Sequence, residues 1–212
     1  MKKSERSALI LEALSKVIEL PKSELVFNSP FQLICAVLLS AQCTDKRVNM
    51  TTPALFERYP SARELAEADV EDVYGIISSI SYPRAKARHL VEMAKMMVRD
   101  FGAEVPSEHS DLVKLPGVGD KTANVVESIA FGHPTIAVDT HVFRVSHRLG
   151  LSKGKTPKAV TEDLVKAIPP QLRGDAHHYL LLFGRYTCKA VNPLCENCPL
   201  TKYCVSKSRF KA

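Results

Sequence analysis

The stretch "LPGVGDKTA", residues 115–123, decides the fold because it fits two incompatible structures. Two glycines, a lysine and a threonine resemble a nucleotide-binding P-loop, which needs a preceding strand and a glycine directly before its lysine. Here Asp120 separates Gly119 from Lys121, and no strand-like segment precedes Leu115. The stretch therefore predicts a tight turn between two helices rather than a nucleotide site.

The rest of the chain has the helical pattern that this interpretation requires. Ser61 and Glu64 have the spacing of a capping box, and Thr156 followed by Pro157 is typical of a helix start. Apolar residues recur at helical spacing, and no long alternating run of β-branched residues interrupts them. We therefore expect an all-α fold.

The turn itself predicts a phosphate site. Gly117 and Gly119 permit positive φ and leave backbone N–H groups unobstructed, while Pro116 fixes one φ angle. Bare amides at a helix N-terminus bind anions, so the amides of Gly117, Val118 and Gly119 are candidates to hold a DNA phosphate. This predicts a helix–hairpin–helix over about 110–132, which grips the DNA backbone without reading its sequence. An ordinary corner between two helices is the alternative for this segment taken alone.

Charge is unevenly distributed along the chain. The formal net charge is +6, and residues 185–212 hold six Lys or Arg residues against one acidic residue, Glu196. A basic cluster on an otherwise balanced protein favours a polyanionic partner, because neutralising phosphates releases counterions. A solubilising tail is the alternative explanation.

The N-terminal segment is basic but does not have the pattern of a signal peptide. Three acidic residues, Glu5, Glu12 and Glu19, interrupt its apolar positions. No apolar run is long enough to span a membrane. We therefore expect a cytoplasmic protein with no membrane partner.

Four of the six cysteines lie close together with the spacing C-x6-C-x2-C-x5-C, namely Cys188, Cys195, Cys198 and Cys204. Disulfides are disfavoured in a cytoplasmic protein, so metal binding is the remaining reason for this concentration of thiols. Zinc sites usually pair two C-x2-C-like knuckles, and only one pair here has that form. A single loop around a [4Fe–4S] cluster fits the spacing better.

The motifs "LPGVGDKTA", "AVDTHVFRV", "LLSAQCTDKRV" and "FGRYTC", together with the cysteine loop, resemble the endonuclease III family of DNA glycosylases and abasic-site lyases. The resemblance covers essentially the whole chain. It implies a two-domain helix–hairpin–helix glycosylase fold: a six-helix barrel over 23–133, and a discontinuous domain of 1–22 and 134–212 with a [4Fe–4S] loop at 188–204. It further implies a monomeric, nucleoid-associated prokaryotic enzyme.

The resemblance also implies a reaction. Lys121 would attack C1′ of the sugar, form a Schiff base and cleave the strand 3′ to the abasic site by β-elimination, after removal of an oxidised pyrimidine. The positive end of the helix dipole disfavours the ammonium form of Lys121, and we expect burial between the barrel and cluster domains to disfavour it further. Asp139 matches the family's catalytic aspartate, although it also has the pattern of a helix N-cap.

The implied partner is double-stranded DNA with damaged bases or abasic sites, and the same resemblance suggests which residues touch it. Gln42 would fill the space left by the flipped nucleotide. Tyr82, followed by Pro83, stands where the family commonly has a leucine that wedges the opposite strand. His141 matches a position near the DNA backbone, and Lys189 is the one basic residue between the first two loop cysteines.

Two alternative functions remain at this point. One is a monofunctional adenine- or thymine-mismatch glycosylase, but such relatives typically lack a lysine at position 121. The other is a non-catalytic DNA-binding scaffold. The joint presence of Lys121 and Asp139 favours the bifunctional enzyme over both.

Overall fold

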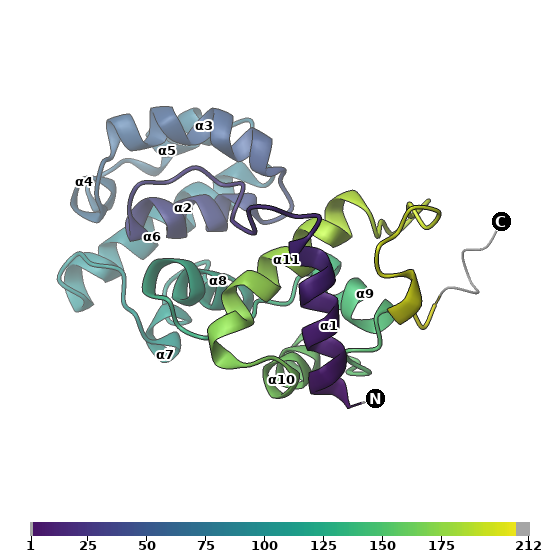
Figure 1. Cartoon of the computed structure of the whole chain (residues 1–212). Coiled ribbons are helices and arrows are strands. Elements are labelled where there is room, and N and C mark those ends of the chain that lie inside the picture. Colours follow the sequence, from purple (N-terminus) through teal and green to yellow (C-terminus); the bar gives the residue numbers. More distant parts are fainter. Residues whose placement is uncertain (1, 207–212) are drawn as a thin grey trace. The chain divides into compact units, whose positions relative to one another are not determined.

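The computed structural model describes residues 2–206, and every regular element within them is a helix (Figure 1). The predicted all-α class is therefore confirmed. The chain divides into two compact units, one formed by Ser23–Gly132 and the other by Met1–Lys22 with His133–Ala212. Over the described part of the chain, no helix combines the length and the apolar character needed to cross a membrane.

The unit Ser23–Gly132 is built around α6. Its helices are α2 (Pro30–Ser40), α3 (Asp45–Arg58), α4 (Ala62–Ala66), α5 (Val70–Ile77), α6 (Pro83–Asp100), α7 (His109–Leu112) and α8 (Asp120–Phe131). The helices α2, α4 and α5 pack against α6, while α8 packs against α2 and α7. Leu90, Met93 and Met97 of α6 are completely buried. Their spacing places them on one helix face, which removes this apolar surface from water.

Local capping signals determine where several of these helices begin. The side chain of Ser29 caps α2, accepting a bond from the Gln32 amide, and the predicted capping box of Ser61 and Glu64 starts α4. Side-chain oxygens satisfy amides that have no partner in the first helical turn. The other end of α2 is at Ser40, two residues before Gln42.

The second unit has its own hydrophobic core. Its elements are α1 (Lys3–Ser15), α9 (Thr140–Arg148), α10 (Pro157–Ala167), the 3₁₀ turn η1 (Pro170–Leu172), α11 (Arg173–Tyr186) and the 3₁₀ turn η2 (Thr201–Tyr203). The helices α1 and α9 each pack against both α10 and α11. Ile10, Leu14, Val145, Leu164 and Leu180 are buried at their centre. The N-terminal helix thus belongs to the same core as the C-terminal third of the chain.

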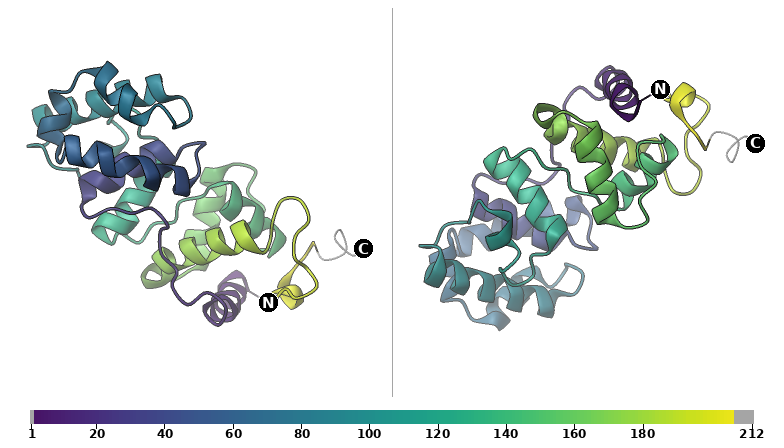
Figure 2. Two further views of the ribbon diagram at one scale, coloured as in Figure 1. Left: turned by 90° about the horizontal axis from the view of Figure 1, so that it is seen from above. Right: turned by 90° about the horizontal axis from the view of Figure 1, so that it is seen from below.

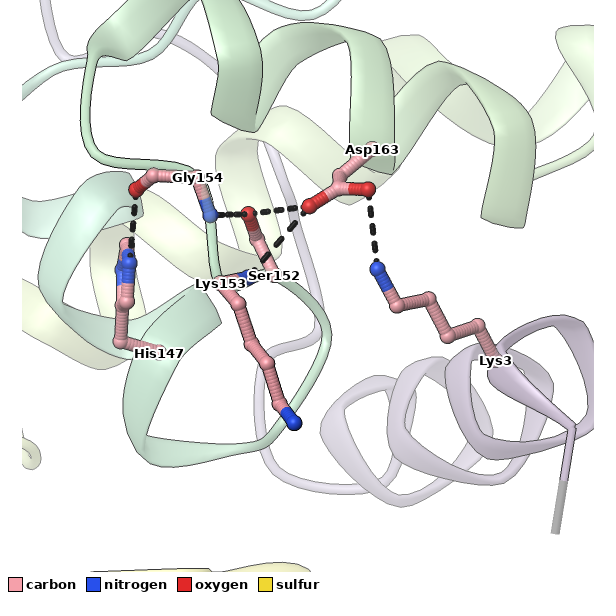
Figure 3. A network of polar contacts seen from close by, with 6 residues as sticks. All are labelled: Lys3, His147, Ser152, Lys153, Gly154 and Asp163. Carbon is pink, nitrogen blue, oxygen red and sulfur yellow. Dashed lines mark hydrogen bonds and ion pairs between the residues drawn. The ribbon is translucent and has the colours of Figure 1, made fainter.

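A polar network fixes α1 and the loop after α9 onto α10 (Figure 3). Asp163 accepts bonds from Lys3 Nζ at 2.9 Å and from Ser152 Oγ at 2.7 Å. The Ser152 hydroxyl accepts a bond from the Gly154 amide, and His147 Nε2 lies 2.9 Å from the Gly154 carbonyl. The hydrogen bonds from Lys3 and Ser152 lower the pKa of Asp163 to about 2. The carboxylate therefore stays ionised in the folded protein to well below neutral pH.

Candidate active site and cysteine loop

The turn between α7 and α8 requires glycine at position 117. The amide of Val118 donates to the Leu115 carbonyl at 3.0 Å, and Gly117 has a φ of 79°. A Cβ at Gly117 would lie 2.9 Å from both His89 Cβ and Leu38 Cδ1. Proline followed by a positive-φ glycine is the pattern of a type II turn. The Val118 amide therefore already has a partner within the turn, and the Val118 side chain is buried.

The beginning of α8 is left open. Gly119 is the N-cap residue, and no side chain among those described caps this helix end. The first helical bond runs from the Ala123 amide to the Gly119 carbonyl, so the amides of Asp120, Lys121 and Thr122 precede it. These amides carry the positive end of the helix dipole. The open end therefore has the donors and the polarity that an anion needs.

Lys121 is the second residue of α8, and its side chain is exposed. The core of its own unit therefore does not bury this lysine, and the expected burial between the two domains stays a prediction. The reason is its position on the helix: Ala123 and Val126 face the core of the unit, which turns Lys121 outward.

Asp139 closes the beginning of α9, as its sequence pattern indicated. Its Oδ1 accepts a bond of 2.7 Å from the Val142 amide, and the side chain is half-buried. The preceding segment is fixed as well, because Ile136 and Ala137 are buried and the Ala137 carbonyl bonds to His177 Nδ1 at 2.9 Å. The carboxylate of Asp139 thus has a defined orientation. It belongs to the second unit, whereas Lys121 belongs to Ser23–Gly132.

His109 links the two helices of the hairpin and was not identified from the sequence. Its Nδ1 lies 2.7 Å from Glu127 Oε2, and its Nε2 lies 3.0 Å from Asp120 Oδ1. Both ring nitrogens face carboxylate oxygens, which accept hydrogen bonds. Only the protonated ring can donate from both nitrogens at once. Burial lowers the pKa of His109, but the hydrogen bonds and charges of Glu127 and Asp120 outweigh this effect and raise it overall. A lone histidine gives no such signal in the sequence.

Gln42 and Tyr82, the two predicted DNA-inserting residues, lie on neighbouring loops of the same unit. Both have left-handed backbones, with φ of 55° and 56°, and both side chains are exposed. The hydroxyl of Ser81 donates to the Gln42 carbonyl at 2.8 Å. The Ser81 hydroxyl therefore connects two segments that are 39 residues apart in sequence.

Lys86 is a buried lysine that sequence reasoning missed. Its side chain is 6% exposed, and Nζ donates to the carbonyls of Leu39 at 2.9 Å and Ala41 at 2.6 Å. Burial lowers its pKa. In the sequence, Lys86 is one of several basic residues in "RAKAR", and nothing local distinguishes it from a solvated lysine.

The four cysteines of the loop are all half-buried, and none of them forms a disulfide within the described residues. Burial raises the pKa of the Cys198 thiol. A bound metal reverses this effect and deprotonates its thiol ligands. Over the described residues, no three metal-binding side chains converge on a point that would hold a single ion. A [4Fe–4S] cluster is larger than a single ion and binds four separate thiolates. Four cysteines in one loop can provide these ligands without converging on one point.

Two arginines of α9 hold the first part of this loop, which is drawn in yellow in Figure 2. Arg144 Nε donates to the Cys188 carbonyl at 3.0 Å, and Arg148 Nη1 donates to the Lys189 carbonyl at 2.7 Å and lies 3.4 Å from Cys188 Sγ. The loop returns to the same helix, where the Val205 amide donates to the Arg148 carbonyl. The signal for this contact is the i, i+4 arginine pair in "FRVSHR", which sequence reasoning did not use.

The other two predicted contact residues lie close to this anchor. His141 is half-buried, and its Nδ1 lies 3.2 Å from Arg144 Nη2. The helices are tightly packed here, since a Cβ at Gly184 would approach His141 Cβ to 2.9 Å. The Lys189 side chain is exposed. Of the basic tail, Lys207, Arg209 and Lys211 lie outside the described residues.

Comparison with known proteins identifies the family. The HhH-GPD superfamily of base excision DNA repair proteins matches residues 35–170, and the iron–sulfur binding domain of endonuclease III matches residues 188–204. Endonuclease III of Bacillus subtilis is 48% identical over 85% of this chain and 83% of its own. Endonuclease III of Escherichia coli is 43% identical over 89% of this chain and 90% of its own.

Solved structures agree with this assignment. A trapped covalent endonuclease III–DNA intermediate has a TM-score of 0.94 and 42% identity, covering 99% of this chain and 98% of that one. A thermostable thymine-DNA glycosylase, 22% identical with a TM-score of 0.87, shares the fold. These matches confirm the predicted glycosylase fold, the iron–sulfur cofactor and the enzyme class, a DNA glycosylase and abasic-site lyase. The chain belongs to the endonuclease III family of HhH-GPD base excision DNA repair proteins.

Proposed function

We propose that this enzyme removes oxidised pyrimidines from double-stranded DNA and then cleaves the strand 3′ to the abasic site. The observation that carries this proposal is Lys121 in the open first turn of α8, directly after the Gly117 turn. In this position an amine lies beside donors suited to a phosphate. The enzyme acts as a monomer in the cytoplasm, and its partner is duplex DNA that contains damaged bases or abasic sites.

The first role belongs to Lys121 as the nucleophile. Its neutral Nζ attacks C1′ of the damaged nucleotide, the N-glycosidic bond breaks, and the base leaves with that electron pair. Opening of the sugar ring gives a Schiff base between Nζ and C1′. Loss of the C2′ proton then breaks the C3′–O bond and expels the 3′ phosphate, and hydrolysis of the imine returns the lysine.

The second role belongs to Asp139 as a fixed carboxylate. Its charge stabilises the positive charge that develops on the sugar as the base departs, and it assists proton transfer. The cap bond from the Val142 amide supports this role, because it restricts the rotation of the carboxylate. A fixed negative charge needs little reorganisation during the reaction.

Binding of the DNA involves both backbone and side-chain groups. The amides of Gly117 and Gly119, with those of the first turn of α8, hold one phosphate. Val118 contributes by filling the core beneath the turn rather than by its amide. Gln42 and Tyr82 insert into the duplex from which the damaged nucleotide has been displaced.

Two further contacts come from the second unit. His141 and Lys189 approach the DNA backbone, which agrees with the exposed side chain of Lys189. The cysteine thiolates of the loop would hold the [4Fe–4S] cluster. When bound, this cluster cross-links four points of a loop that has little regular structure, which stabilises its folded form.

Strand cleavage without alkali tests this proposal. A duplex with one oxidised pyrimidine, labelled at the 5′ end of the damaged strand, is incubated with the enzyme and analysed without heating. We expect cleavage by wild type and by the exposed-lysine control Lys95→Ala, and none by Lys121→Ala. If alkali is needed to reveal the break in the wild-type reaction, the enzyme is a monofunctional glycosylase and the proposal is wrong.

A further inference from the structure

Lys86 occupies a position that is unusual for a lysine. An ammonium group is rarely buried unless it is paired, since leaving water is unfavourable for a charge. Its Nζ bonds to the carbonyls of Leu39 and Ala41, at the end of α2. The last carbonyls of a helix lack helical partners and carry the negative end of the dipole, so a cation is favourable there. Lys86 therefore holds the end of α2 directly before Gln42.

The same residue also takes part in the start of α6. The Lys86 amide donates to the Tyr82 carbonyl at 3.1 Å, which forms the first helical turn after the Tyr82 loop. Ser81 adds a second connection through its bond to the Gln42 carbonyl. The Gln42 loop and the Tyr82 loop are thus connected twice, once through the buried ammonium and once through a hydroxyl.

Both connected residues need such support. A left-handed backbone is uncommon for residues other than glycine and is maintained by the surrounding structure. Gln42 and Tyr82 both adopt it, and their side chains are exposed rather than packed into the core. The restraint acts on the backbone instead. The Ser81 hydroxyl bonds to the Gln42 carbonyl, and the Lys86 ammonium bonds to the Ala41 carbonyl directly before Gln42. The Lys86 amide bonds to the Tyr82 carbonyl.

We propose that Lys86 and Ser81 are positioning residues that hold Gln42 and Tyr82 at a fixed spacing, as one two-pronged element that enters duplex DNA opened at a damaged nucleotide. This inference rests on the proposed function, in which Gln42 and Tyr82 insert. The open end of α8 and Lys121 take no part in these contacts. Loss of the contacts should therefore weaken insertion into the duplex and leave the reaction at Lys121 intact. A single-stranded abasic site has no paired strand to open, so it does not need the two prongs.

The test compares two DNA substrates. Borohydride trapping rates are measured on an abasic site in a duplex and on the same site in a single strand. The variants are Lys86→Met, which removes the ammonium and keeps an unbranched apolar side chain, and Ser81→Ala. The controls are Ser81→Thr, which keeps the hydroxyl, and Ser78→Ala, an exposed serine three residues earlier.

We expect Lys86→Met to slow trapping on the duplex by roughly tenfold, the equivalent of about 1.4 kcal/mol. Ser81→Ala should slow it by about threefold, since one neutral hydrogen bond is lost. Both should trap single-stranded DNA at a rate within about twofold of wild type, because the open end of α8 that bears Lys121 is unchanged. Ser81→Thr and Ser78→Ala should match wild type on both substrates.

Equal losses on the two substrates would show a merely structural role and overturn the inference. Thermal unfolding is followed for each variant, and if Lys86→Met does not fold, the comparison of Ser81→Ala with Ser81→Thr decides the question. Failure of wild type to trap either DNA would instead contradict the proposed function, and this inference with it. The two kinds of failure are therefore distinguishable.

Discussion

The helices α8 and α9 both begin with backbone amides that have no helical partner, but among the described residues only α9 has a side chain that caps them. At α8 the N-cap is Gly119, which has no side chain, and the first amides are left open next to Lys121. At α9 the N-cap is Asp139, whose carboxylate accepts the Val142 amide. The first arrangement suits a phosphate from outside the protein, whereas the second orients a carboxylate of the protein itself. The difference shows that the cap residue determines whether a helix end leaves its first amides open or uses them to orient a side chain.

Among the substitutions considered, replacement of Gly117 should reduce the free energy of unfolding most, because it disrupts the turn that leads into α8. Gly117→Ala combines a φ of 79° with a Cβ only 2.9 Å from His89 Cβ and Leu38 Cδ1. We expect a loss of about 3 kcal/mol in the free energy of unfolding. Urea unfolding measures it. The matched control is Gly75→Ala in α5, where a Cβ would meet no atom within 4 Å. That variant should be slightly more stable than wild type, and a similar loss in both would contradict the strained turn.

Two substitutions of Asp139 separate its roles at the closed helix start. Asp139→Ala removes the cap and should destabilise the protein by about 1 kcal/mol. Asp139→Asn keeps a good N-cap residue, so its stability should stay close to wild type while the rate of base removal falls. Thermal unfolding and a glycosylase assay on the same preparations check both statements. Equal activity of Asp139→Asn and wild type would remove the catalytic role and leave only the cap.

The open start can also be closed deliberately. Gly119 has φ −101° and ψ 177°, and a Cβ there would meet no atom within 4 Å, so Gly119→Ser fits without strain. The new hydroxyl should cap α8 and raise the free energy of unfolding by a few tenths of a kcal/mol, roughly the difference between Ser and Gly caps. At the same time, it should weaken binding to undamaged duplex DNA in a fluorescence anisotropy titration. Unchanged DNA affinity in a stabilised variant would show that these amides do not hold a phosphate.

The smallest effect concerns the pH dependence of the hairpin. The pKa of His109 is raised in the folded protein, so its contribution to stability is fully present below its unfolded pKa of about 6.5. It is lost as the pH rises through the higher folded value. His109→Gln should therefore reduce stability more at pH 6 than at pH 9 in parallel denaturation curves. The contact is partly exposed, so the effect is modest. A constant difference across this range would mean that folding does not change the pKa of His109.

The sequence predicted those features that depend on neighbouring residues. The cap at Asp139, the capping box at Ser61 and the turn at Gly117 each follow from a few adjacent side chains, and the structure contains all three. Family membership followed from several short motifs in combination. Such local signals need no knowledge of how the chain packs.

Features that depend on distant contacts could not be predicted in the same way. The side chain of Lys86 reaches carbonyls 45 and 47 residues earlier, and Arg148 reaches the cysteine loop about 40 residues later. The exposure of Lys121 depends on which face of α8 meets the core, and the Val118 amide is used within the turn. These facts follow from tertiary packing, which overrides the expectation from any single motif.

Borohydride trapping on a duplex with one oxidised pyrimidine tests the central claim, that Lys121 forms a covalent intermediate at the open helix start. We predict a covalent protein–DNA adduct for wild type and for Lys95→Ala, a weaker adduct for Asp139→Asn and none for Lys121→Ala. An adduct of undiminished yield with Lys121→Ala, or the absence of any adduct with wild type, would contradict it.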